Sequence, residues 1–250
     1  MAYQTIIYQK ETDIGRITLN RPQAMNAITP DLLKELKAAI LEAGKDKDVK
    51  VIVITGAGKA FCAGVDLKSL GSRKLVNGRV GDILDIPGQE LMQVIRTIPK
   101  VVIALVNGFC FTGALELMLG CDLAIAAEDA KIGDTHTKWG LRPTWGMSAR
   151  LPRRVGFLKA KELSFTADAI SGKEAERIGL VNLAVPAAKL NEALLSMVKK
   201  ITSNSMQAVA AYKYIYNTNE NMTVEKSLEF ESKSDFEISD TEEKLAQFRK

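Results

Sequence analysis

The sequence of 250 residues carries 34 lysines and arginines and 30 aspartates and glutamates, which gives a formal net charge of +4. Because acidic and basic residues are interspersed, the charge does not point to a nucleic-acid-binding protein, and no apolar run is long enough to span a membrane. The hydrophobic share of 46% is ordinary for a globular protein, and a chain of this length buries a core that needs no disulfide or metal.

Cysteine usage and the N-terminal residues bear on the compartment. The cysteines lie inside or beside apolar runs without metal-ligand spacing, so we expect reduced, buried thiols at Cys62, Cys110 and Cys121. The first residues, MAYQTIIYQK, contain neither an apolar signal core nor an arginine-rich leader. A cytoplasmic protein without a metal site is therefore expected.

Local patterns in the first third of the chain predict a hairpin, a helix and a buried strand. Residues 5–8 and 16–19 are short apolar runs around a turn, which is typical of a hairpin. Residues 29–31, Thr-Pro-Asp, open a helix with a capping hydroxyl, a proline at its first position and an acid in its first turn. Residues 51–55 predict a strand that leads into residues 56–70, GAGKAFCAGVDLKSL. This glycine-rich stretch lacks the spacing of a P-loop, so no polyphosphate site is expected there.

Residues 99–122 offer what we interpret as half of an active site. An apolar run at residues 101–106 predicts a buried strand, and a helix is expected to begin at Gly113. Backbone N–H groups at a helix start have no intrahelical partner, and a glycine there lets a ligand come close to them. Glu116 is expected in the first turn, off the apolar face. The alternative is structural, because acids are common in a first helical turn for their favourable interaction with the helix dipole.

The flanking segments complete an alternation of helices and strands. Residues 69–86 predict a mobile or partly helical flap, and Pro87 begins a helix that runs to Ile95. A strand at residues 123–127 precedes a long loop, residues 131–146, that contains the only histidine, His136, and the tryptophans Trp139 and Trp145, which we interpret as core or contact aromatics or as walls of a pocket.

After that loop, helical patterns predominate. Residues 157–165 look helical, and a capping box opening at Ser171 begins a helix that Gly179 ends. Residues 180–185 predict a last strand. Beyond Pro186 only helices are expected, at residues 190–201, 206–216, 224–232 and 240–249.

Four segments in order resemble the enoyl-CoA hydratase/isomerase (crotonase) superfamily: ITLNRPQAMNAI, VIVITGAGKAFCAGVDLKSL, KVVIALVNGFCFTGALELMLGCDLAIAA and ISGKEAERIGLVNLAVP. The resemblance spans essentially the whole chain. It implies an α/β fold with a crotonase-like ββα spiral core at residues 1–188 and a C-terminal helical trimerisation region at residues 189–250. It also implies an acyl-CoA substrate, no cofactor beyond the coenzyme A of that substrate, and a homotrimer or a hexamer.

The resemblance further implies roles for individual residues. Backbone N–H groups of Val65 and Gly113 would form the oxyanion hole, and Glu116 matches the first of two glutamates that the family's hydratases use. The positions that match the lining of the CoA channel are Ala63, Asp66, Leu67 and Lys68. Lys68, Arg21 and Arg73 are candidates for phosphate contacts, with solvated surface residues as the alternative.

The second glutamate is replaced. Matching the glycines of the loop KIGDTHTKWG puts His136 at its position. An imidazole, whose reference pKa is near ~6.5, exchanges protons at neutral pH, and Asp134 is placed to orient it. The alternatives are a spectator histidine and, less favoured, a nucleophile.

These residues lead to one main functional hypothesis. We expect an enoyl-CoA hydratase that adds water to an α,β-unsaturated acyl-CoA, with Glu116 as base, Val65 and Gly113 holding the enolate oxygen, and His136 as the second catalytic group. The alternatives are another acyl-CoA reaction of the superfamily (isomerisation, hydrolysis or decarboxylation) and a non-catalytic acyl-CoA-binding protein.

Overall fold

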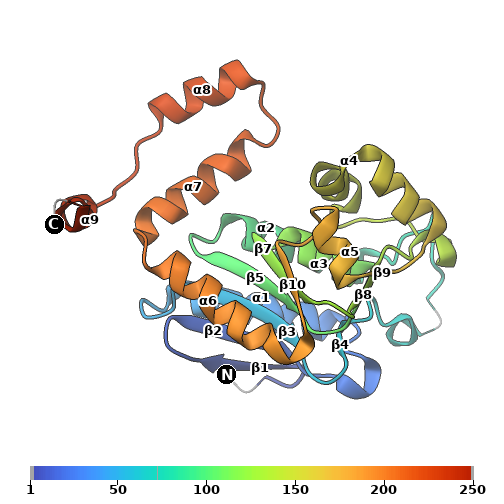
Figure 1. The fold of residues 1–250 in the computed structure, drawn as a ribbon. Helices are drawn as coiled ribbons and strands as arrows, with labels where there is room; N and C mark the ends of the chain where they lie inside the picture. The colour runs from blue at the N-terminus through green and yellow to red at the C-terminus, as the bar shows by residue number, and fades with distance from the viewer. Residues whose placement is uncertain (1–2, 72, 249–250) are drawn as a thin grey trace.

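The computed structural model describes residues 3–71 and 73–248, which form two small sheets surrounded by helices (Figure 1). The strands are β1 (Ile6–Lys10), β2 (Ile14–Leu19), β3 (Val51–Gly56), β4 (Ala60–Cys62), β5 (Val101–Val106), β6 (Phe109–Phe111), β7 (Leu123–Ala127), β8 (Lys131–Gly133), β9 (Ile170–Ser171) and β10 (Leu183–Val185). The α-helices are α1 (Pro30–Lys45), α2 (Asp82–Thr97), α3 (Gly113–Gly120), α4 (Met147–Thr166), α5 (Gly172–Arg177), α6 (Leu190–Thr202), α7 (Met206–Asn219), α8 (Val224–Lys233) and α9 (Thr241–Phe248). Short 3₁₀ helices are η1 (Pro22–Ala24), η2 (Leu67–Leu70), η3 (Thr137–Trp139) and η4 (Ala187–Lys189).

From β3 to β8, successive strands of the chain alternate between the two sheets. The six-stranded sheet has the order β1-β2-β3-β5-β7-β10, and the four-stranded sheet has the order β4-β6-β8-β9. In each of the units β3-β4-α2, β5-β6-α3 and β7-β8-α4, the first strand joins the larger sheet and the second joins the smaller one. This repetition confirms the expected α/β spiral of ββα turns.

The core lies where the apolar runs predicted it. All six residues of β5 are buried, and β5 pairs in parallel with β3 and β7, so both of its edges and both of its faces are covered. The Thr29 side chain caps α1 by accepting from the Leu32 amide, and the Ser171 side chain caps α5 in the same way, as the sequence signals predicted. The three cysteines are free and buried, which confirms that expectation.

Two predicted boundaries were wrong. Helix α2 begins at Asp82 rather than Pro87, and Pro87 lies inside it. Acidic residues in the first turn favour the longer helix, and the buried Asp85 is held by Arg79 at 2.9 Å and by Thr144 at 2.7 Å. These contacts offset the hydrogen bond that the proline removes.

The last strand, β10, is shorter than predicted. The amides of Leu180 and Val181 donate to the Ala175 carbonyl at the end of α5, so these two residues close the helix instead of joining the sheet. All four strands of the smaller sheet (β4, β6, β8 and β9) were missed, because runs of two or three residues carry too little periodicity to signal a strand, and η3 was missed as well.

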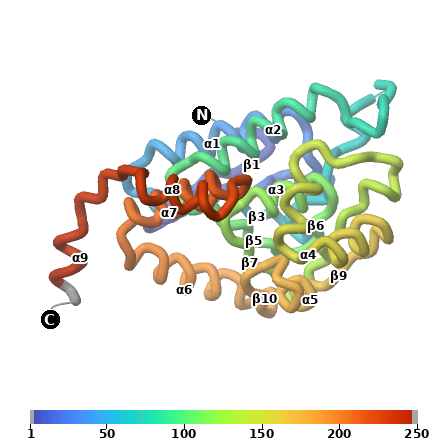
Figure 2. The backbone as a smooth tube through the Cα atoms, turned by 90° about the horizontal axis from the view of Figure 1, so that it is seen from above, coloured from blue at the N-terminus to red at the C-terminus, as the bar shows by residue number. Residues whose placement is uncertain are grey.

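The C-terminal helices leave the sheets progressively. Helix α6 packs on the core through buried Leu190, Leu194 and Val198, whereas α8 lies apart from the sheets in Figure 1 and α9 extends away from the core in both views (Figures 1 and 2). Helix α7 is attached by Lys213, whose Nζ lies 2.7 Å from a carboxylate oxygen of Asp122. Within the described ranges, no helix has both the length and the apolar character needed to cross a membrane.

Candidate active site

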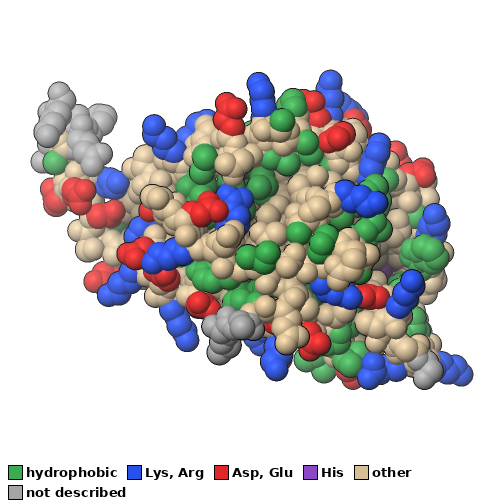
Figure 3. Space-filling model, turned by 90° about the horizontal axis from the view of Figure 1, so that it is seen from below, with side chains coloured by type: hydrophobic (Ala, Val, Ile, Leu, Met, Phe, Trp, Pro, Cys, Tyr) green, Lys and Arg blue, Asp and Glu red, His purple; other side chains and the backbone are tan. Residues whose placement is uncertain are grey.

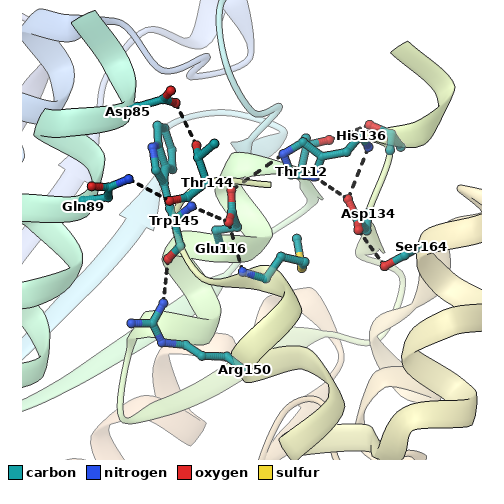
Figure 4. Close-up of polar contacts among 12 residues, drawn as sticks. Asp85, Gln89, Thr112, Glu116, Asp134, His136, Thr144, Trp145, Arg150 and Ser164 are labelled. Atoms are coloured by element: carbon teal, nitrogen blue, oxygen red, sulfur yellow. Dashed lines mark hydrogen bonds and ion pairs between the residues drawn. The ribbon is translucent and has the colours of Figure 1, made fainter. Parts of the chain in front are cut away.

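Glu116 is the buried acid around which the candidate site is built. Its side chain lies in the first turn of α3 and is only 2% exposed, a burial that the sequence did not predict. Helix α3 is covered on nearly all sides, because the residues that lead into α4 fold over it. Two amides of that segment compensate the carboxylate: Oε1 accepts from the Trp145 N–H at 2.9 Å and from the Met147 N–H at 3.0 Å (Figure 4).

The fold brings His136 to the other oxygen of this carboxylate. His136 immediately precedes η3, and its Nε2 lies 3.7 Å from Glu116 Oε2. Its Nδ1 lies 2.7 Å from an oxygen of Asp134. Glu116, His136 and Asp134 are all at most 7% exposed, which places two acids and one imidazole in a nearly water-free setting.

Burial controls the protonation of Glu116. Removal from water raises the pKa of Glu116 above its ordinary value of 4.5, while the nearby His136 and the two backbone hydrogen bonds act in the opposite direction. A carboxyl group with a raised pKa exchanges protons more readily near neutral pH than a solvated glutamate does. The setting therefore suits a general base or acid.

Val65 and Gly113 line one cavity together with Glu116 and His136, and its volume is about 60 Å³. Gly113 is the first residue of α3, where an N–H has no intrahelical acceptor. Val65 follows β4 and forms a parallel bridge with Ile28, in which Gly64 O and Asp66 N make the hydrogen bonds. The Val65 amide consequently points away from Ile28.

Gly64 makes the approach of these two segments possible. It has a φ of +91°, and an added Cβ would lie only 2.9 Å from the Phe111 carbonyl oxygen. The small residues that the sequence placed at this turn are thus required by close backbone packing.

The other predicted site residues divide between the cavity and its surroundings. Ala63 and Leu67 line the cavity. Asp66 does not: its carboxylate accepts from the Ser69 amide at the start of η2 and pairs with Arg21 at 2.9 Å. Lys68 is exposed on η2.

Trp145 forms one wall of the cavity, as the sequence had allowed. It is 3% exposed, and a Cβ added to Gly113 would lie 2.9 Å from Cζ3 of its ring. Trp139 also lines the cavity but is 60% exposed. The indole of Trp145 therefore limits the space next to the Gly113 amide.

Sequence reasoning missed the residues that hold these groups in place. The amides of Trp145 and Met147 gave no sequence signal, because any residue supplies an N–H. Thr112 has a φ of +56°, which is strained for a β-branched residue, and its Oγ1 lies 2.5 Å from Thr135 Oγ1. Thr112, which precedes Gly113, is thus held in an uncommon backbone conformation by its contact with Thr135, a residue of the loop that carries His136.

Comparisons with known proteins show the family of the chain. The family model described as enoyl-CoA hydratase/isomerase matches residues 9–247. The chain is 36% identical over 244 residues to a short-chain-enoyl-CoA hydratase of Clostridium acetobutylicum, covering 97% of this chain and 92% of that protein. It is 37% identical over 233 residues to a crotonyl-CoA hydratase of Syntrophomonas wolfei, covering 93% of this chain and 88% of the relative. The crystal structure of an enoyl-CoA hydratase from Bacillus anthracis superimposes with a TM-score of 0.86 at 35% identity, covering 92% of this chain and 88% of that one. The chain therefore belongs to the enoyl-CoA hydratase/isomerase family.

Proposed function

We propose that the protein is an enoyl-CoA hydratase that adds water across the α,β double bond of a short acyl-CoA thioester. The observation that carries the proposal is the meeting of Glu116 and His136 in one cavity with the Val65 and Gly113 amides. The family membership and the names of the relatives support the reaction class.

In the proposed reaction, Glu116 takes a proton from water while the water oxygen bonds to the β-carbon. The electrons of the double bond move to the thioester carbonyl oxygen, where the amides of Val65 and Gly113 stabilise the enolate, each by roughly 3–4 kcal/mol. The proton taken by Glu116 then passes from Oε2 to the lone pair on His136 Nε2, and His136 gives it to the α-carbon, so both side chains end as they began. The sum is one water added, with no redox change, so we expect no cofactor beyond the substrate's coenzyme A.

The size of the cavity supports a short acyl group. Its volume is about 60 Å³, whereas a cavity of ~150 Å³ is known to hold benzene. The Trp145 ring closes the side next to the Gly113 amide. An acyl chain of few carbons therefore suits the site better than a long one.

Turnover of crotonyl-CoA tests the function directly. We expect loss of the enoyl-thioester ultraviolet absorbance and a product heavier by one water, with kcat/KM decreasing as the acyl chain lengthens. A product of unchanged mass would indicate isomerisation, and released coenzyme A or carbon dioxide would indicate hydrolysis or decarboxylation. Binding without turnover of any thioester would favour the non-catalytic alternative.

Gly113→Ala tests the oxyanion hole. The added Cβ would lie 2.9 Å from Trp145 Cζ3 and 3.5 Å from Ile28 Cδ1, so either the ring or the helix start must shift. Because small displacements of catalytic groups are costly, we expect kcat/KM to decrease at least ~10-fold for every thioester that the wild type turns over. Unchanged kinetics would remove the Gly113 amide from the mechanism.

We also propose that residues 189–250 form an oligomerisation region that makes the protein a trimer or a hexamer. Large apolar side chains are more than half exposed on α7 and α8, among them Tyr212, Tyr216 and Leu228. Light scattering of the full chain should give three or six times the protomer mass, and Leu228→Asp should lower that mass. A monomeric wild type would contradict the proposal.

Localisation and partners follow from the same proposal. Three free, buried cysteines suit the reducing cytoplasm. Figure 3 shows basic and acidic side chains interspersed on the face it presents, which suits a small-molecule substrate better than a nucleic acid.

A further inference from the structure

Asp134 is a buried acid that lies next to His136 but does not line the cavity. One of its oxygens, Oδ1, lies 2.7 Å from His136 Nδ1 and also accepts the His136 backbone N–H at 3.2 Å. Its other oxygen, Oδ2, accepts the Ser164 hydroxyl at 2.7 Å (Figure 4). Both carboxylate oxygens thus accept hydrogen bonds, Oδ1 from His136 and Oδ2 from α4.

Helix α4 holds this loop at a second point. The hydroxyl of Thr137 donates to the Ser164 carbonyl oxygen at 2.7 Å. Ser164 therefore contacts the loop through both its side chain and its backbone, and fixes Asp134 relative to the helix.

The charge of Asp134 determines which ring nitrogen carries the proton. Burial alone would raise the pKa of Asp134, but the hydrogen bonds from His136 and Ser164 outweigh it and lower that pKa, so the carboxylate is ionised at neutral pH. An ionised carboxylate only accepts hydrogen bonds, so Nδ1 must be the donor. In the neutral ring the lone pair is then on Nε2, the atom that faces Glu116 Oε2 at 3.7 Å.

We propose that Asp134, held by Ser164, is a positioning residue that keeps His136 in the Nδ1–H form, so that Nε2 is the atom that exchanges the proton with the substrate. This inference rests on the proposed hydratase function. It gives roles to Asp134 and Ser164, the last two residues in a line of contacts that runs from Glu116 through His136. Without the carboxylate, the neutral ring is free to carry its proton on Nε2, where no lone pair then remains to take up the proton from Glu116.

The test uses the fact that His136 is the only histidine of the chain. In protein labelled with ¹⁵N-histidine, one ring gives the whole signal, and the two nitrogens report its tautomer at a pH where the ring is neutral. We expect the wild type to show the Nδ1–H form. Asp134→Asn, whose amide can turn its NH₂ toward Nδ1, should shift the ring toward the Nε2–H form. It should also lower kcat at least ~10-fold with less than ~3-fold change in KM, because an inverted tautomer disables the proton transfer and leaves the binding surface intact.

Ser164→Ala is the matched variant, since it removes only the contact to Oδ2. It should keep the Nδ1–H form and lose less activity than Asp134→Asn. An Nε2–H ring in the wild type overturns the inference, even if Asp134→Asn fails to fold. Wild-type kcat in a folded Asp134→Asn protein overturns it as well. The failure of the proposed function has a different signature, namely a wild type that shows the Nδ1–H ring and does not hydrate crotonyl-CoA.

Discussion

Glu116→Gln is expected to lower kcat for crotonyl-CoA hydration at least ~100-fold, the usual scale for loss of a positioned general base. The amide is isosteric with the carboxylate, and its oxygen can accept the same Trp145 and Met147 N–H groups that hold Glu116 Oε1. Its NH₂ can donate to His136 Nε2. The fold and the affinity for acyl-CoA should therefore survive, while the group that takes a proton from water is lost.

The stability of this variant gives a second, independent measurement. Because burial raises the pKa of Glu116, the folded protein binds this proton more tightly than the unfolded chain, and stability falls as pH rises from 4.5 through the raised pKa. At neutral pH the ionised carboxylate therefore costs stability, and neutral glutamine removes that cost. Calorimetry at neutral pH should give a Tm no lower than that of the wild type.

The pH–rate profile of the wild type follows from the same shift. A base must be ionised, so kcat/KM should decrease toward acid through a pKa above that of an ordinary glutamate.

Glu128→Gln is the control for Glu116→Gln, because it makes the same change at an exposed position, and it should leave turnover unchanged. Near-wild-type activity in Glu116→Gln would exclude Glu116 as the base.

The fold could be predicted where the signal was local. The apolar run of β5, the cap at Thr29 and the cap at Ser171 each depend on neighbouring residues, and each was confirmed. The start of α2 could not be predicted, because it depends on contacts between Asp85 and Thr144, which are distant in sequence. A proline rule based on neighbours alone gave the wrong boundary.

The site residues, too, could be predicted where the signal was local and not where it depended on distant contacts. Glu116 and Gly113 were predicted from the start of a helix. His136 was predicted from its position in a loop that resembles the corresponding loop of the family. Burial of Glu116 was missed, since it depends on the segment at Trp145 and Met147, which folds over α3 from 29 and 31 residues away. Ser164 gave no signal at all, because a serine inside a helix is ordinary, and only the folded structure brings it to Asp134.

His136→Gln should lower kcat by about the same factor as Glu116→Gln, on the order of 100-fold, because glutamine can hydrogen-bond at this position but cannot release a proton to the α-carbon. In the structure the His136 ring lies between two carboxylates, with Nδ1 2.7 Å from Asp134 Oδ1 and Nε2 3.7 Å from Glu116 Oε2. Initial rates on crotonyl-CoA, with circular dichroism to confirm folding, measure the effect. Full turnover in His136→Gln would make His136 a spectator and leave Glu116 with an unidentified partner.

His136→Glu recreates the pair of glutamates that the family's hydratases use, but the surroundings argue against a simple rescue. The new carboxylate would lie between Glu116 and Asp134, both nearly fully buried, and like charges this close raise one another's pKa and destabilise the fold. Asp134→Asn removes one of the three charges. We therefore expect His136→Glu alone to be poorly active, and the double variant Asp134→Asn/His136→Glu to be more active than either single one. A double variant more active than either single variant means that the effects of the two substitutions are coupled. A double-mutant cycle on kcat/KM measures this coupling. If His136→Glu alone matches the wild type, Asp134 exerts no such electrostatic influence on position 136.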